Sequence, residues 1–127
     1  MSNIIVGGYP SGGFYTQDDI RGYKVYTALL TQTGATPPVA TVLENTIGIT
    51  PSFVYNTTGE YTINFTGLSI NPDKVVIFTG QSDENSKGIV NAWCNSTPTL
   101  YITCYDLAGA AIDDLLDRTS IEIRIYP

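Results

Sequence analysis

Strict alternation of apolar and polar residues in short runs constrains the fold of this chain more than any other feature. In the run TSIEIRIY (119–126) every second residue is an isoleucine, and Glu122 and Arg124 stand between them. Successive side chains of a β-strand point to opposite faces, so a period of two predicts a strand with one buried face. The same alternation recurs at 61–66 and at 100–105. The chain is therefore expected to fold as strands.

Together with five further runs, these three predict eight strands, at Tyr23–Thr33, Val39–Glu44, Ser52–Asn56, Tyr61–Thr66, Lys74–Thr79, Gly88–Asn95, Leu100–Tyr105 and Thr119–Tyr126. The breaks between them are specific: Pro37 and Pro38 cannot donate to a ladder, and Gly59 can take a positive φ in a hairpin turn. Short strands separated by such turns predict an antiparallel β-sandwich or jelly roll over residues 23–127. The segment 107–117 differs, because Ile112, Leu115 and Leu116 have helical spacing, and we expect a long connection with one helical turn.

The first 22 residues lack any periodicity and form a predicted N-terminal arm. Four glycines in the first 13 residues and a fifth at Gly22 would lose much backbone entropy on ordering, and the segment is nevertheless too apolar for a solvated tail. A segment of this kind usually becomes ordered by lying on another surface, which favours a role in assembly. Its expected docking anchors are Ile4, Ile5, Val6, Tyr9, Phe14 and Tyr15.

The charge balance excludes one class of partner. Charged residues make up only 14% of the chain, and six basic against twelve acidic residues give a net charge of −6. Nucleic-acid binding is not expected, because neutralising phosphates requires grouped Lys and Arg. No secretory leader is recognisable and no apolar run approaches the length of a membrane span, so we expect synthesis in the cytosol, or transport to the outside within a larger particle, and no membrane insertion.

No histidine is present, which removes the usual general base near neutral pH and the commonest metal ligand. A Ser-His or Cys-His nucleophile is therefore impossible. Cys94 and Cys104 are too few for a four-ligand zinc site, and we expect two buried free thiols. No cofactor is predicted, and the protein is not expected to be an enzyme. A hydrolase with a pair of catalytic carboxylates is the least favoured alternative.

Two groups of acidic residues could hold Ca²⁺ through carboxylate oxygens. One group is Asp113, Asp114 and Asp117, and the other is Asp83 and Glu84. Neither has a ligand at every second position, as a calcium-binding loop does. We therefore expect solvated loop carboxylates and no metal site.

Aromatic residues are the stronger functional signal. In the first predicted strand both faces are largely apolar, with Tyr26 and Leu30 on one of them. Trp93, Tyr101 and Tyr105 occupy faces that alternation leaves outside the core. These five residues are the predicted subunit interface or ligand site, because Trp and Tyr often dominate protein interfaces. Two alternatives are stacking on sugar rings and burial of these residues under a loop.

The stretch YKVYTALLTQTGATPPVATVLENTIG (23–48) and the ending DDLLDRTSIEIRIYP (113–127) resemble a small β-sandwich module of virion proteins. This module belongs to tailed phages of Bacteroidetes hosts, including crAss-like phages. The resemblance implies a non-enzymatic structural protein of the virion, a homotrimer in a head fibre, capsid decoration or tail fibre. Its implied partners are copies of itself and a capsid or tail protein. At a fibre tip, the module would recognise a host receptor or surface glycan.

Overall fold

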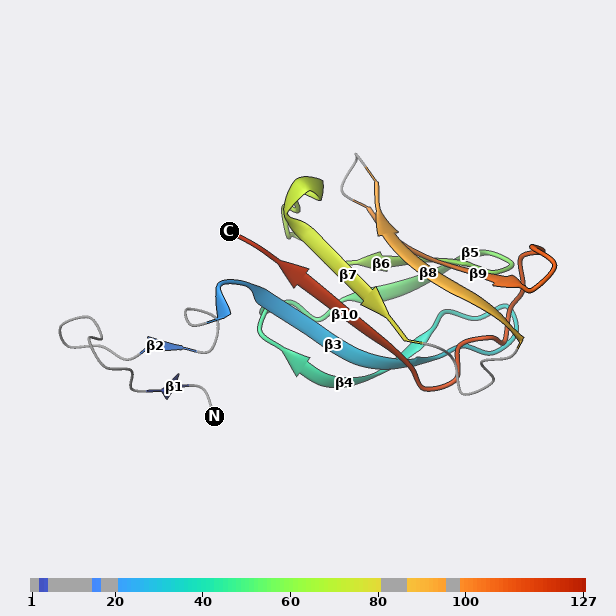
Figure 1. Ribbon diagram of the computed structural model, residues 1–127, viewed down its shortest axis with the longest axis horizontal. Helices are drawn as coiled ribbons and strands as arrows, with labels where there is room; N and C mark the ends of the chain where they lie inside the picture. The colour runs from blue at the N-terminus through green and yellow to red at the C-terminus, as the bar shows by residue number, and fades with distance from the viewer. Residues whose placement is uncertain (1–2, 5–14, 17–20, 81–86, 96–98) are drawn as a thin grey trace.

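The computed structural model describes residues 3–4, 15–16, 21–80, 87–95 and 99–127. Two layers of antiparallel strands make up the body (Figure 1). The strands are β3 (Lys24–Thr31), β4 (Val39–Asn45), β5 (Ser52–Thr57), β6 (Glu60–Asn64), β7 (Val75–Thr79), β8 (Gly88–Cys94), β9 (Leu100–Asp106) and β10 (Thr119–Ile125). A turn of 3-10 helix, η1 (Pro72–Lys74), precedes β7. All eight predicted strands are confirmed, with ends that differ by a few residues.

The two sheets have the strand orders β4-β3-β10-β7 and β5-β6-β9-β8. Three pairs of consecutive strands form hairpins: β3–β4 in the first sheet, and β5–β6 and β8–β9 in the second. Every other connection crosses from one sheet to the other. Gly59 has φ +70° in the β5–β6 turn, as its position predicted. The first and last strands of the body, β3 and β10, are neighbours at the centre of their sheet. The expected β-sandwich is confirmed.

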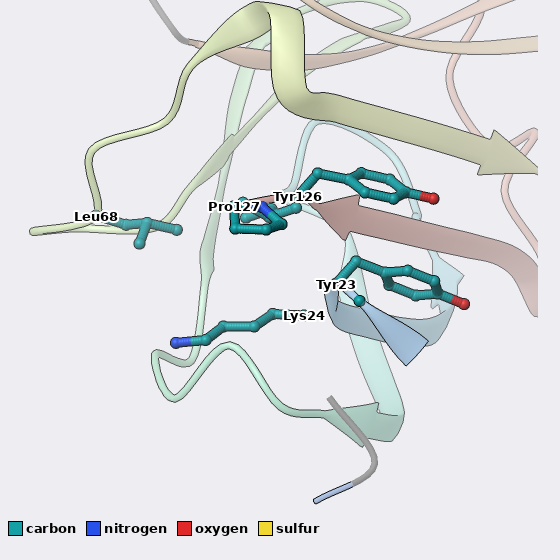
Figure 2. Close-up of a pocket in the computed structure, with 7 residues that line it drawn as sticks. Tyr23, Lys24, Leu68, Tyr126 and Pro127 are labelled. Carbon is teal, nitrogen blue, oxygen red and sulfur yellow. The ribbon is translucent and has the colours of Figure 1, made fainter. Parts of the chain in front are cut away.

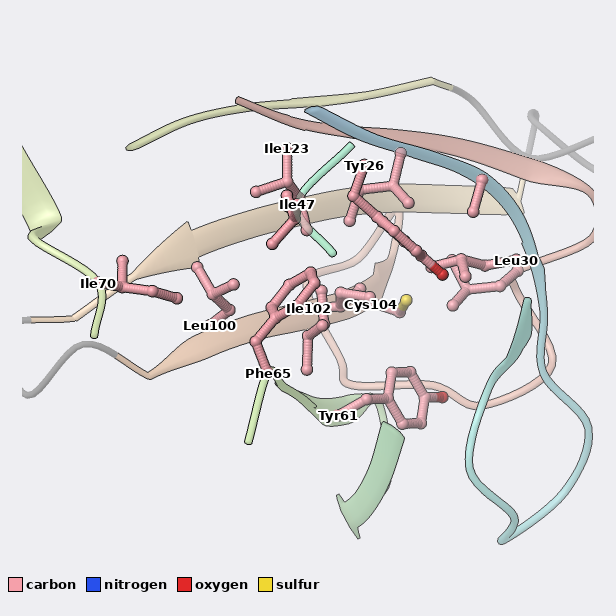
Figure 3. Packing of buried hydrophobic residues seen from close by; sticks show 14 of the residues in the cluster. Tyr26, Leu30, Ile47, Tyr61, Phe65, Ile70, Leu100, Ile102, Cys104 and Ile123 are labelled. Carbon is pink, nitrogen blue, oxygen red and sulfur yellow. The ribbon is translucent and has the colours of Figure 1, made fainter. Parts of the chain in front are cut away.

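The core lies between the two sheets, where the inward side chains of each strand meet (Figure 3). The ring of Tyr26 on β3 packs edge-to-face against Phe65, which follows β6, with centroids 5.7 Å apart. Tyr26 and Leu30 are each only 1% exposed. Their prediction as interface or ligand residues is therefore wrong. On the opposite face of β3, Val25 is also buried, whereas Leu29 is half-buried.

Residues 107–118 connect β9 to β10 without the expected helical turn. Gly109, Asp114 and Arg118 all have positive φ, which is incompatible with a right-handed helix. Leu115 and Leu116 are nevertheless buried, and the backbone N–H of Gln32 donates to the carbonyl of Leu116. The spacing that suggested a helix thus belongs to a loop, which places Leu115 and Leu116 in the core.

In the predicted arm, β1 (Asn3–Ile4) and β2 (Tyr15–Thr16) pair antiparallel, with Ile4 opposite Tyr15. The other four predicted anchors, Ile5, Val6, Tyr9 and Phe14, lie outside the described residues. Docking through the arm stays a prediction. Among the described residues, no helical segment has the length and apolar character needed to cross a lipid bilayer.

Candidate binding face

The outward side of the β5-β6-β9-β8 sheet is named here the aromatic face. The registers of the three strand pairs place Val54, Thr62, Tyr101 and Trp93 in one row across all four strands. Neighbouring strands are about 4.8 Å apart, so adjacent side chains of such a row are within contact distance. The row brings together residues separated by up to 47 positions in the sequence, from Val54 to Tyr101.

Trp93 and Tyr101 form the centre of this face. Their rings are stacked, with centroids 4.8 Å apart and planes inclined by 28°. Trp93 is nevertheless 45% exposed, so part of its surface stays open to solvent. Tyr105 lies on the same face, opposite the exposed Ile89 and about 13 Å further along β9 at 3.3 Å per residue. The structure therefore places all three predicted aromatic residues on one face and brings two of them into contact.

Uncharged polar side chains surround this aromatic pair. Among the outward positions of the four strands, Glu60 is the only charged residue. Asn56 donates through its amide to the hydroxyl of Thr62 at 2.7 Å, which leaves the hydroxyl proton of Thr62 available to a ligand. The side chain of Asn64 is exposed and makes no hydrogen bond to any described residue.

A hollow of about 400 Å³ lies at the end of β6, beside Thr62, and is named here the threonine hollow. The polar side chains that line it are those of Thr62, Asn64, Thr66 and Thr99. Continuing the β6–β9 register by one residue beyond Ile63 and Leu100 places Asn64 opposite Thr99. Sequence reasoning missed this hollow. The signal in the sequence was the polar residues at alternate positions, Thr62, Asn64 and Thr66. They indicate an outward face of this strand, but not which residues of other strands lie beside them.

A second hollow, of about 560 Å³, lies where the predicted arm joins the body (Figure 2). It is lined by Gly22, Tyr23, Lys24, Leu68, Ile125, Tyr126 and Pro127. The rings of Tyr23 and Tyr126 are 5.2 Å apart. Lys24 and Leu68 lie on the side of the pocket away from the two tyrosine hydroxyls (Figure 2). This hollow can accept an apolar group beside one cation.

The outward side of the other sheet carries a chain of charged and aromatic contacts. The guanidinium of Arg124 lies 4.7 Å from the ring centres of both Tyr23 and Phe78. Its Nε donates to Glu122 at 2.6 Å, and this hydrogen bond raises the pKa of Arg124. Arg21 pairs with Glu44 on β4 at 3.2 Å. These contacts hold Arg21 and Tyr23, where the predicted arm meets the body, against the sheet. They also place the guanidinium groups of Arg21 and Arg124 in contact with side chains of the same chain.

Asp113 is not the solvated loop carboxylate that the sequence predicted. One carboxylate oxygen accepts from the backbone N–H of Gly59 and the hydroxyl of Tyr61, both at 2.8 Å, and the other accepts from Tyr55 at 2.7 Å. Desolvation opposes ionisation, but the three hydrogen bonds outweigh it and lower the pKa of Asp113. Asp114 accepts from the backbone N–H of Gly34. These carboxylates fasten the 107–118 loop.

Asp83 and Glu84 lie outside the described residues. Within the part of the chain that is described, no three Cys, Asp or Glu side chains gather as metal ligands would.

Both cysteines are free, as expected. Cys104 is buried and Cys94 is half-buried, and they are not cross-strand partners because Cys104 pairs with Val90 and Cys94 with Leu100. Burial raises the pKa of Cys104 to about 12, and the charge of Asp113 adds to the shift. Burial also raises the pKa of Cys94. Neither thiol has the depressed pKa of a nucleophilic cysteine.

Comparison with known proteins gave no match to a protein-family model, to a curated protein or to a solved structure. The resemblance to a phage virion module therefore stays a prediction from the sequence. The class that the structure defines is an all-β sandwich with an aromatic outward face.

Proposed function

We propose that this protein is a non-enzymatic structural component of a phage virion, a head fibre, capsid decoration or tail-fibre protein. It docks to the particle through residues 1–22 and assembles with identical copies, as a trimer if the resemblance holds. The localisation proposed is the virion, after synthesis in the host cytoplasm. The body presents its surfaces outward from the point of attachment.

The observation that carries the proposal is the open edge formed by β4. Among the described strands, β4 has a partner on one side only, and it exposes Val39 by 70% and Leu43 by 60%. Monomeric proteins commonly protect such edges with charges or proline, because unpaired N–H and C=O groups recruit another chain. Glu44 is the only charged residue in β4. An edge strand that exposes two large apolar side chains supports association with another copy.

The root of the arm supports attachment at one end of the body. Arg21 and Tyr23 are held to the outer face by Glu44 and Arg124, so the arm leaves from a fixed point. The 560 Å³ hollow borders the same point and can receive an apolar side chain of the particle.

Replacing Leu43 by lysine should dissociate the oligomer, because a charge on the β4 edge opposes pairing with a second strand. Light scattering should show a multiple of 13.7 kDa for the wild type and a single-chain mass for Leu43→Lys. The matched control is Thr50→Lys, which adds the same charge at an exposed position outside the strands and should leave the mass unchanged. A wild-type chain that stays monomeric at concentrations of several hundred micromolar would refute assembly.

Deleting residues 2–20 should leave a folded oligomer that no longer joins the particle, since both sheets begin after this segment. The measurement is the occupancy of the truncated protein on purified particles, with its melting temperature as the control for folding. Full occupancy without the arm would contradict the docking role of residues 1–22.

A further inference from the structure

We propose that the aromatic face binds a neutral saccharide, with a sugar ring on the Trp93–Tyr101 pair and sugar hydroxyls in the threonine hollow. This inference goes beyond assembly. It uses the sheet that does not contain β4, so it does not depend on the proposed contact between copies.

The chemistry of the two parts of the site is complementary to a sugar. A pyranose ring presents an apolar C–H surface together with hydroxyls that both donate and accept. One side of the Trp93 indole packs on Tyr101 while the residue stays 45% exposed, so an aromatic surface is open to such a ring. Binding pockets typically combine aromatic walls with a few polar groups that fix orientation, and the threonine hollow supplies hydroxyls and one amide.

The geometry suits a ligand longer than one sugar. Thr62, Tyr101 and Trp93 are consecutive in one row, so Thr62 and Trp93 are separated by two strand spacings, or about 10 Å. This is about the span of two linked sugar units. One unit stacks on Trp93, and the next reaches the hydroxyl of Thr62 and the amide of Asn64, which donate no hydrogen bond to any described side chain or backbone group.

Charge selects the class of saccharide. The outward positions of the four strands contain no Lys or Arg, and Glu60 is the single charge among them. An anionic glycan would meet no cation there and would be repelled by Glu60 and by the net charge of −6. A neutral ligand pays no such electrostatic penalty.

Fluorescence titration tests the proposal directly, because Trp93 is the only tryptophan in the chain. The probes are hexasaccharides of glucose, galactose and mannose, with hexagalacturonate as the anionic probe. At least one neutral probe should change the Trp93 emission in a saturable way, and the anionic probe should bind at least tenfold more weakly. No saturable change with any neutral probe up to about 10 mM, the range of weak sugar binding, would overturn the proposal. Equal binding of the anionic probe would overturn it as well.

Two substitutions locate the ligand in the threonine hollow. Asn64→Ala and Thr66→Ala each remove exposed polar atoms that line it, and each should weaken binding about fivefold, the effect of one lost hydrogen bond. Thr50→Ala removes an equally exposed hydroxyl elsewhere and should change nothing. Unfolding curves verify that all variants fold. Wild-type affinity in both hollow variants would refute the site.

A titration of the Leu43→Lys variant separates this site from assembly. The dissociation constant should be unchanged, because β4 belongs to the other sheet. Loss of binding in a folded Leu43→Lys monomer would mean that the site forms between copies, which would overturn a site within one chain. If Leu43→Lys still binds the saccharide and the wild type is monomeric, the proposed assembly is refuted and the saccharide site is not.

Discussion

Alanine at position 59 is expected to lower the free energy of unfolding by about 3 kcal/mol or more, the range of strongly destabilising substitutions. Gly59 has φ +70°, a conformation that costs an L-residue about 1–2 kcal/mol. An added Cβ would also lie 2.5 Å from the carbonyl oxygen of Cys104 and 2.9 Å from the backbone nitrogen of Ile112. These are backbone atoms, so no side chain can rotate away to make room.

The surroundings of Gly59 explain why the backbone cannot shift at low cost. Its carbonyl accepts from the N–H of Cys104 at 2.8 Å, and its own N–H donates to Asp113. The N–H of Ile112 in turn donates to the carbonyl of Cys104. The β5–β6 turn, β9 and the 107–118 loop therefore meet at one point, and moving any of them breaks hydrogen bonds of the other two.

Gly48→Ala is the matched control for this substitution. Gly48 also has a positive φ, +90°, but a Cβ there would meet no atom within 4 Å. It should lose only the conformational cost of about 1–2 kcal/mol. Urea unfolding gives the loss in unfolding free energy for Gly59→Ala and for Gly48→Ala. The difference between the two losses is the effect of the close contacts that a Cβ makes at Gly59. Equal losses would show that the close approach at Gly59 carries no energy.

Removing the carboxylate of Asp113 is expected to cost about 3 kcal/mol, since hydrogen bonds to charged groups contribute about 1.5–3 kcal/mol each and neighbouring solvent offsets part of the loss. The substitution Asp113→Ala deprives the Gly59 N–H and the hydroxyls of Tyr55 and Tyr61 of their common acceptor. Tyr61 is fully buried, so its hydroxyl finds no water in exchange. Asp73→Ala at an exposed site is the control, and it should change stability little by urea unfolding.

The same carboxylate makes stability depend on pH in the acid range. The pKa of Asp113 in the folded state lies below its ordinary value of 3.8, so ionisation favours folding. Its contribution is complete above about pH 4 and is lost as the pH falls through the lowered folded pKa. The stability difference between wild type and Asp113→Asn should therefore shrink below pH 4. A difference that stays constant from pH 7 to 2.5 would contradict this role.

The sequence predicts the strands well because alternation is a local property. The runs at 61–66, 100–105 and 119–126 each carry their own period of two, and proline and glycine mark the breaks. The 107–118 loop could not be predicted, because Leu115 and Leu116 are placed by long-range bonds to Gln32 and not by a local helix. Tyr26 and Leu30 were misassigned because both faces of this strand are largely apolar, so alternation does not show which face lies against the other sheet.

The candidate site was predictable in part for the same reason. The outward position of Trp93 and Tyr101 follows from alternation and from the β8–β9 hairpin. The position of Thr62 beside Tyr101 depends on the pairing of β6 with β9, which are 39 residues apart at these positions. No local pattern encodes that pairing, so the threonine hollow appears only in three dimensions.

The central position of β3 also determines how the body bears force. The arm continues directly into β3, which is hydrogen-bonded to β10 along Lys24–Leu30 and to β4 along Tyr26–Thr31. Tension on the arm therefore pulls β3 lengthwise between two ladders and loads their hydrogen bonds in parallel, as a shear. Bonds loaded together must fail together, whereas an edge strand peeled from its end loses them one at a time. A tether that enters at a central strand such as β3 therefore loads two ladders, whereas one that enters at an edge strand loads only one.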